Sequence, residues 1–376
     1  MRVKAVLQSN AVLLCAVVIV QFGLFEAGLR LAGGSEAAPE FQRLFMPDQA
    51  LGYRLKPGAT ARFKTTEFDT SIVINAAGLR DREIGPKAPA EHRVIVLGDS
   101  LVMAVQVSLG DTLTAHLERL LNEGAVPPST FRVINAGVQG YGPVEEYLFY
   151  RDVAARLQPD VVILGLYAGN DAVEAASTGY RLRDRDARQS AAHRFGAFER
   201  FTQWRRRVIR RSMVLQVARL RTTTVLDRFG WRRPEVDLPL RTYLPDAPPE
   251  ITRGLDVMTD AVSRLDALTR SQGARLIVVL LPARFQVDDE DFTRLRDGVA
   301  RLGETLERDR ATERFTSALE KTGVPVLDVL PALRHAAQES DVFMRSTAHF
   351  TPFGHKTIAR AIQEHLTQHG MFEHGR

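Results

Sequence analysis

The chain has little cysteine, since Cys15 is the only one among 376 residues. An intramolecular disulfide framework and a cysteine-based metal cluster are therefore excluded. Histidines and carboxylates also lack the spacing of a metal site, and no GxxxxGK[ST] phosphate loop occurs. We therefore expect no metal and no cofactor. A chain of this length can build a stable core without covalent cross-links.

Long apolar runs are also scarce, and the marked one lies at the N-terminus. Arg2 and Lys4 precede an apolar run at residues 11–25. Basic residues in front of such a run place the N-terminus in the cytoplasm and the remainder outside. The run is short for a membrane span of about 20 residues, but residues 7–31 are long enough. No clear small-residue cleavage site follows, so an uncleaved anchor over residues 1–34 is favoured over a cleaved signal peptide.

The net charge is modest, +5, and its distribution is uneven. Arginines crowd the stretch from Arg181 to Arg233, where few acids interrupt them. Apolar residues recur there at helical spacing: Trp204, Val208, Ile209, Met213, Val217 and Leu220. The stretch is either a basic amphipathic helix for a membrane surface or an anionic glycan, or a surface helix with its basic face in water. The second interpretation is favoured, and nucleic acid is not expected as a partner outside the cytoplasm.

Four short polar blocks occur along the rest of the chain. The first ends the buried-strand pattern RVIVLGDS (Arg93–Ser100) in Gly-Asp-Ser. A glycine turn (NAGVQGYG, 135–142), an Asn-Asp turn (GLYAGND, 165–171) and a histidine turn (AHFTPFGH, 348–355) follow in that order. The carboxyl ends of parallel strands lie at one edge of a sheet, which is where α/β proteins place their sites.

Each block contains a residue type that ester chemistry needs. A serine hydroxyl is a poor nucleophile until a base takes its proton, and His349 suits that task because imidazole titrates near neutral pH. Attack on an ester creates an oxyanion, which needs hydrogen-bond donors. The backbone N–H groups of Ser100 and Gly140 and the side-chain amide of Asn170 could supply three. His349 is favoured over His355, which opens the last helical stretch and suits a cap or packing role.

The same residues also have ordinary structural interpretations. Ser100 could be a helix N-cap beside Asp99, a turn residue that could also support the site. Asn170 and Asp171 could be an ordinary turn pair. The order of the blocks favours function for Ser100 and Asn170, and Asp171 is interpreted as a cap of the following segment. Two further glycines of the glycine turn are interpreted as turn residues: Gly137 and Gly142.

In this order the blocks resemble the SGNH (GDSL-type) hydrolase superfamily, named for its Ser, Gly, Asn and His. The matching residues are Ser100, Gly140, Asn170 and His349. The resemblance covers roughly residues 91–370, and INAAGLRDRE (74–83) is similar to a segment before the nucleophile in membrane-anchored bacterial members. It implies a flavodoxin-like three-layer α/β/α fold with a mainly parallel five-stranded sheet. It also implies a serine esterase or O-acyltransferase, and it leaves the substrate open.

One position departs from the family pattern. Members usually carry an aspartate two or three residues before the histidine to orient the imidazole, and those positions here are Thr347 and Ser346. Neither can supply a negative charge. The nearest acids upstream are Asp341 and Glu339, and Asp328 follows a predicted strand. The spacing leaves open a Ser-His dyad, a remote carboxylate partner and a weakened site, in which Asp341 or Thr347 could have a supporting role.

The chain is predicted to contain an anchor (1–34), a small pre-domain with a linker (35–90) and a hydrolase domain (91–376). The hydrolase domain carries a basic helical insertion at about residues 174–249. Strands are predicted at residues 93–97, 132–135, 161–166, 274–281 and 324–328, and helices at residues 112–122, 144–157, 251–271 and 294–321. Strand-like alternation also occurs in the pre-domain, at residues 63–75.

These features together predict a single-pass protein of the bacterial inner membrane with a periplasmic catalytic domain. Its expected partner is an ester-bearing envelope substrate, a polysaccharide or a lipid-linked glycan, by analogy of fold and location. No residue decides between hydrolysis and acyl transfer. The alternative is a weakened SGNH domain that binds a glycan or a partner protein.

Overall fold

The computed structural model describes Gln21, residues 37–182 and residues 235–372. The predicted anchor and the arginine-rich helical pattern of the insertion therefore lie outside the described residues. Within the described ranges, no helix is both long enough and apolar enough to cross a membrane. The described residues 37–182 and 236–372 belong to one compact unit.

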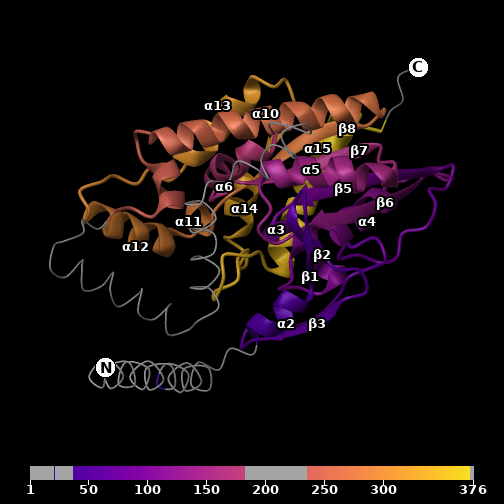
Figure 1. Cartoon of the computed structure of the whole chain (residues 1–376), viewed down its shortest axis with the longest axis horizontal. Coiled ribbons are helices and arrows are strands. Elements are labelled where there is room, and N and C mark those ends of the chain that lie inside the picture. Colours follow the sequence, from indigo (N-terminus) through magenta and orange to yellow (C-terminus); the bar gives the residue numbers. More distant parts are fainter. Residues whose placement is uncertain (1–20, 22–36, 183–234, 373–376) are drawn as a thin grey trace, which may run out of the picture. The chain divides into compact units, whose positions relative to one another are not determined.

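A parallel five-stranded sheet with the order β6-β5-β7-β8-β9 forms the centre of this unit (Figure 1). Its strands are β5 (Glu91–Gly98), β6 (Thr130–Gly137), β7 (Val161–Tyr167), β8 (Arg275–Leu281) and β9 (Val326–Asp328). Counting only these strands, the order is 2-1-3-4-5, which is the flavodoxin-like arrangement with its switch point between β5 and β7. The predicted three-layer α/β fold with a parallel five-stranded sheet is confirmed.

Helices cover both faces of the sheet, which explains why its strands are nearly continuous apolar runs. Val94 and Val96 of β5 belong to one buried cluster, whereas Ile95 and Leu97 belong to another on the opposite face. The face of Ile95 packs against α5 (Pro143–Asp152), α6 (Asp171–Thr178), α10 (Pro249–Ser271) and α13 (Arg310–Glu320). The face of Val94 packs against α3 (Ser100–Met103), α4 (Leu113–Glu123), α14 (Leu330–Ala336) and α15 (Pro352–Gln368).

The remaining described helices are short or peripheral. The α-helices are α2 (Ala37–Arg43), α11 (Arg284–Val287) and α12 (Asp289–Ala300). The 3-10 helices are η1 (Leu109–Asp111), η2 (Ala154–Leu157), η3 (Gly179–Leu182) and η4 (Leu238–Tyr243).

The helix predicted over residues 294–321 is wrong in extent, because α12 ends at Ala300 and α13 begins at Arg310. Gly303 lies between them with φ +82, a left-handed conformation that glycine adopts at no steric cost. Leu306 of the same connection is buried. The apolar spacing of the sequence thus runs on through a turn that separates two helices, and this is why the sequence predicts a single helix.

The segment before the sheet forms two antiparallel hairpins. One pairs β1 (Phe45–Asp48) with β2 (Gly52–Leu55), and the other pairs β3 (Thr60–Lys64) with β4 (Asp69–Val73). Their buried residues, among them Leu51, Leu55 and Ile72, belong to the same apolar cluster as one face of the large sheet. The segment predicted as a pre-domain therefore shares its core with the large parallel sheet.

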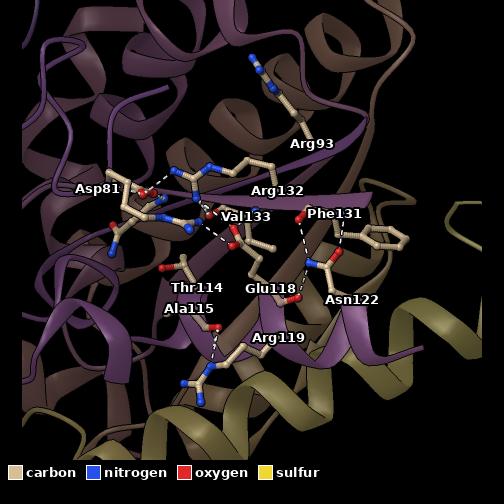
Figure 2. Close-up of polar contacts among 12 residues, drawn as sticks. Asp81, Arg93, Thr114, Ala115, Glu118, Arg119, Asn122, Phe131, Arg132 and Val133 are labelled. Atoms are coloured by element: carbon tan, nitrogen blue, oxygen red, sulfur yellow. Dashed lines mark hydrogen bonds and ion pairs between the residues drawn. The ribbon is translucent and has the colours of Figure 1, made fainter. Parts of the chain in front are cut away.

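Side chains accept hydrogen bonds from backbone N–H groups along the free edge of β6 (Figure 2). Glu118 and Asn122 of α4 accept hydrogen bonds from the backbone N–H groups of Val133 and Phe131, both at 2.9 Å. Asp81 also lies at this edge, where it pairs with an arginine of β6 (Figure 2). Because an unpaired strand edge invites pairing with another chain, these contacts protect the sheet.

Candidate active site

Ser100 begins α3 immediately after β5, at the carboxyl edge of the sheet. Asp99 is the N-cap of α3, and its carboxylate accepts a hydrogen bond from Leu101 N at 2.8 Å. The turn depends on Gly98, since a Cβ there would lie 2.3 Å from Val102 Cγ2. Ser100 is partly buried, and its turn is fixed by packing and by the Asp99 cap.

His349 meets Ser100 from the far end of the sequence. Its Nε2 lies 3.0 Å from Ser100 Oγ, across a separation of 249 residues. Burial lowers the pKa of His349 to about 4, so the imidazole is neutral at physiological pH. If the hydroxyl donates to Nε2, the imidazole proton is on Nδ1. This arrangement lets the imidazole accept the serine proton.

The Nδ1 atom of His349 is buried and has no hydrogen-bond partner among the described residues. The carboxylate of Asp341 pairs instead with Arg345 at 3.1 Å, and that of Asp328 accepts from a backbone N–H in its own turn. Thr347 Oγ1 is also buried without a partner. Within the described residues, the geometry is that of a Ser-His pair with no acid on the imidazole.

His355 lies in α15 and is fully buried. Its ring packs against Phe350, with 5.7 Å between the ring centroids. Burial lowers the pKa of His355 to about 3. These contacts agree with the packing role that the sequence favours for this histidine.

Gly140 lies beyond the end of β6 in the left-handed region, with φ +72. A Cβ at this position would lie 2.8 Å from the hydroxyl oxygen of Tyr53 in β2. That hydroxyl donates to the carbonyl of Gln139 at 2.8 Å, and the Tyr141 hydroxyl donates to the carbonyl of Tyr53 at 2.6 Å. The first hairpin thus holds the glycine turn, and Gly140 is exposed there.

The other two glycines of this block serve close packing. A Cβ on Gly137 would lie 2.4 Å from Met103 N, so glycine is needed for α3 to pack against the end of β6. A Cβ on Gly142 would lie 2.9 Å from the Cβ of Glu174. Neither residue has a positive φ. The interpretation of Gly137 and Gly142 as turn residues therefore leaves out the close packing that requires glycine at both positions.

Asn170 precedes α6 at the end of β7 and is its N-cap, without a capping hydrogen bond from its side chain. Its Nδ2 donates to Glu174 Oε1 at 2.9 Å, and its Oδ1 is buried without a partner. An amide nitrogen carries two hydrogens, so one N–H remains for a ligand. The prediction that Asp171 caps the following helix is wrong, because its carboxylate accepts from Tyr167 N at 2.7 Å.

Five buried or half-buried carboxyl groups surround this part of the site: Asp99, Glu145, Glu146, Asp171 and Glu174. Burial, followed by repulsion from neighbouring carboxylates, raises the pKa of Glu174 to about 8. The same two causes hold the pKa values of Glu146 and Asp171 well above their usual range. Burial also raises the pKa of Asp99, to about 6. Near neutral pH the carboxyl group of Glu174, which contacts Asn170, is therefore mostly protonated, and this limits negative charge beside the Asn170 amide.

Three carboxyl groups of this set lie outside the four sequence blocks and were not predicted from the sequence: Glu145, Glu146 and Glu174. Glu145 and Glu146 follow a proline at a helix start, where acids are ordinary first-turn residues. In the structure, Glu146 is 1% exposed and neither of its carboxyl oxygens has a partner, while Glu145 pairs with Arg181 at 2.8 Å. Among the described residues, no group of three or more His, Cys, Asp or Glu has the geometry to hold a metal ion.

Comparison with known proteins supports the family resemblance for the C-terminal part. Residues 246–375 match a family model described as "SGNH hydrolase-like domain, acetyltransferase AlgX". This range contains His349 and excludes Ser100, Gly140 and Asn170. No curated protein sequence matches the chain at a significant level.

The similar solved structures include an acetylxylan esterase and an alpha/beta hydrolase. The crystal structure of TesA has a TM-score of 0.39 and 10% identity, covering 74% of this chain and 99% of TesA. Axe2, an acetylxylan esterase from Geobacillus stearothermophilus, has a TM-score of 0.40 and 14% identity, covering 73% and 93%. LAE5, an alpha/beta hydrolase from the metagenome of Lake Arreo, Spain, has a TM-score of 0.40 and 15% identity, covering 77% and 98%. Likenesses this distant carry no information about substrate.

Proposed function

We propose that this protein is a serine ester hydrolase or O-acyltransferase that works through an acyl-Ser100 intermediate. The observation that supports it most is the 3.0 Å contact between Ser100 Oγ and His349 Nε2 at the switch point of the sheet. A hydroxyl in contact with a neutral imidazole is the arrangement that activates a serine nucleophile.

In the first half of the reaction, Ser100 Oγ attacks the ester carbonyl carbon and its proton passes to His349 Nε2. The carbonyl oxygen becomes an oxyanion, which the N–H groups of Ser100, Gly140 and Asn170 are proposed to stabilise. Collapse of this intermediate breaks the bond to the leaving alcohol, and His349 returns the proton to that alcohol. The acyl group remains on Ser100 as an ester.

In the second half, water or a second hydroxyl compound attacks the acyl group. His349 takes the proton of the attacking group and returns it to Ser100 Oγ as the acyl–serine bond breaks. Water gives a carboxylic acid, whereas a sugar hydroxyl gives a new ester. Hydrolysis and acyl transfer therefore need the same protein groups and differ in the acceptor.

The test compares wild type with Ser100→Ala on a water-soluble acetyl ester. Ser108→Ala is the matched control, because the Ser108 hydroxyl is exposed and bonds to Asp111 at 2.7 Å. Loss of turnover in Ser100→Ala alone, with an unchanged circular dichroism spectrum, is the expected result. Wild-type turnover in Ser100→Ala would rule out this nucleophile.

The substrate and the location form part of the proposal. An uncleaved anchor at residues 1–34, with its basic residues in the cytoplasm, gives an inner-membrane protein whose catalytic domain faces an envelope polysaccharide or lipid-linked glycan. A C-terminal alkaline phosphatase fusion should then be active and should stay with membranes after a salt wash. An active fusion found in the soluble fraction would indicate a cleaved signal peptide instead.

A second candidate is a binding module that uses the same pocket without turnover. The partnerless Nδ1 of His349 favours it, because nothing among the described residues stabilises an imidazolium there. A fluorophosphonate probe separates the two candidates. Labelling of wild type and not of Ser100→Ala supports the enzyme, and no labelling of either supports the binding module.

A further inference from the structure

The segment that carries His349 is held by a carboxylate from the N-terminal hairpins. Glu67 lies in the turn between β3 and β4. Its Oε1 accepts from the backbone N–H of Arg345 at 2.5 Å, and its Oε2 accepts from the backbone N–H of Ser346 at 2.9 Å. Oε2 also accepts from the Ser346 hydroxyl. One side chain thus satisfies three donors that lie 278 or 279 residues away in sequence.

We propose that Glu67 is a positioning residue for His349, which rests on the function proposed above. It acts by fixing the backbone of residues 345 and 346, and it does not touch the imidazole. Glu67 therefore fixes the position of His349, but it does not stabilise the positive charge of a protonated imidazole.

The need for such a contact follows from how His349 is held. Phe343 and Phe350 form an isolated antiparallel bridge, and Met344 N donates to the carbonyl of His349 at 2.7 Å. Residues 345–348 are therefore the tip of a closed loop. The imidazole has its contact to Ser100 and no partner on Nδ1, so its position depends on the loop backbone. Glu67 binds the tip of this loop.

The same N-terminal segment also holds the backbone that follows Ser100. The Thr70 hydroxyl donates to the carbonyl of Val105 at 2.6 Å. The guanidinium of Arg80, 1% exposed, donates to the carbonyls of Met103 and Val107, both at 2.6 Å, and to that of Ala104. These carbonyls lie at or just beyond the end of α3, whose first residue is the nucleophile.

Both members of the Ser-His pair are therefore attached to one stretch of chain, residues 67–80. Arg80 and Thr70 fix the serine side through buried contacts, whereas Glu67 fixes the histidine side through an exposed one. Releasing Glu67 frees the base relative to the nucleophile and leaves the core intact. A misplacement of about 1 Å can cost a factor of about a hundred in rate, so the contact is expected to affect turnover more than folding.

The experiment measures kcat and KM for an acetyl ester in Glu67→Ala, Glu67→Gln and Asp69→Ala. Asp69 is the matched control, since it is an exposed carboxylate of the same hairpin that pairs with Arg62 at 2.8 Å. Glu67→Ala should lower kcat by about 10- to 100-fold with little change in KM. Glu67→Gln keeps one acceptor oxygen but turns an NH2 group toward one of the donors, so it should recover only part of the loss. Asp69→Ala should match wild type.

Two further measurements separate positioning from a merely structural effect. Hydrogen exchange at the amides of Arg345 and Ser346 should accelerate in Glu67→Ala and stay slow in Asp69→Ala. In a double-mutant cycle, Ser346→Ala should cost less in the Glu67→Ala background than in wild type, because the two side chains share one contact.

The outcomes distinguish this inference from the proposed function. Unchanged kcat in Glu67→Ala, or an equal loss in Asp69→Ala, overturns the positioning role while an active wild type upholds the esterase. A wild type without turnover overturns the proposed function and the catalytic part of this inference together. The exchange rates then still decide whether Glu67 holds the loop, and unchanged exchange in Glu67→Ala overturns that contact as well.

Discussion

Glu174→Gln should widen the pH range over which this protein turns over an ester. In wild type, the pKa of His349 near 4 should set the acid limb of the pH–rate profile, and the pKa of Glu174 near 8 should set its basic limb. Below about pH 8, Glu174 is protonated and accepts from Asn170 as a neutral group. Above it, an ionised Glu174 places negative charge beside Asn170, the proposed oxyanion donor. Glutamine keeps the acceptor and stays neutral at every pH.

The expected pH dependence of kcat/KM follows from the pKa values of His349 and Glu174. In the proposed mechanism His349 acts as a base in its neutral form, and its lowered pKa keeps that form populated down to about pH 4. The value of kcat/KM should therefore be level between about pH 5 and 7, whereas an ordinary imidazole would lose about half its activity at pH 6.5. One unit above the pKa of Glu174, the wild type should retain about a tenth of its plateau and Glu174→Gln nearly all of it.

The assay is acetate release from a soluble ester between pH 4 and 9, with Ser100→Ala supplying the uncatalysed background. Circular dichroism at each pH checks that the protein stays folded. Two results would refute the reasoning. One is an acid limb near pH 6.5 in wild type, and the other is an identical basic limb in wild type and Glu174→Gln.

Three other predictions concern single residues. Asn170→Ala should lower kcat by about a hundredfold or more, as loss of one oxyanion donor does elsewhere, and a change confined to KM would show a binding role instead. Thr347→Asp should place a carboxylate near the partnerless Nδ1 of His349, which raises kcat and moves the acid limb of the pH–rate profile to higher pH. The gain can be large, because losing the acid of a full triad costs about ten-thousandfold. An unchanged kcat and an unchanged acid limb would contradict this prediction. Glu146→Met should stabilise the fold increasingly as pH rises above about 4.5, because a carboxyl whose pKa is raised by folding loses stability from its unfolded pKa upward. Urea unfolding at pH 5 and pH 8 measures this effect, and an equal change in unfolding free energy at both pH values would contradict it.

The sheet could be predicted because each of its strands is an apolar run that ends in turn residues. The strand patterns at residues 93–97 and 161–166 fall within β5 and β7, and the blocks that follow them place Ser100 and Asn170 on neighbouring strand ends. The break between α12 and α13 was missed because charged and apolar residues continue at helical spacing through the turn at Gly303.

The carboxyl groups around the site could not be predicted because burial is a tertiary property. Glu174 stands four residues after Asn170 in an ordinary helical position, and its contact with Gly142 arises only when β6 and β7 are placed in the sheet. In the sequence, Glu67 is an ordinary polar residue of a turn. The three groups that donate hydrogen bonds to it belong to Arg345 and Ser346, near the other end of the chain. No local pattern connects positions so far apart.

The most direct test of the central claim is to trap the acyl-enzyme. Wild-type protein is mixed with an activated acetyl ester, quenched in acid within milliseconds to seconds, and digested for peptide mass spectrometry. We predict one added acetyl group on the peptide that contains Ser100, absent in Ser100→Ala and slow to form in a His349→Ala variant. Turnover without acetylation of Ser100, or acetylation of another residue that decays at the turnover rate, would contradict the account.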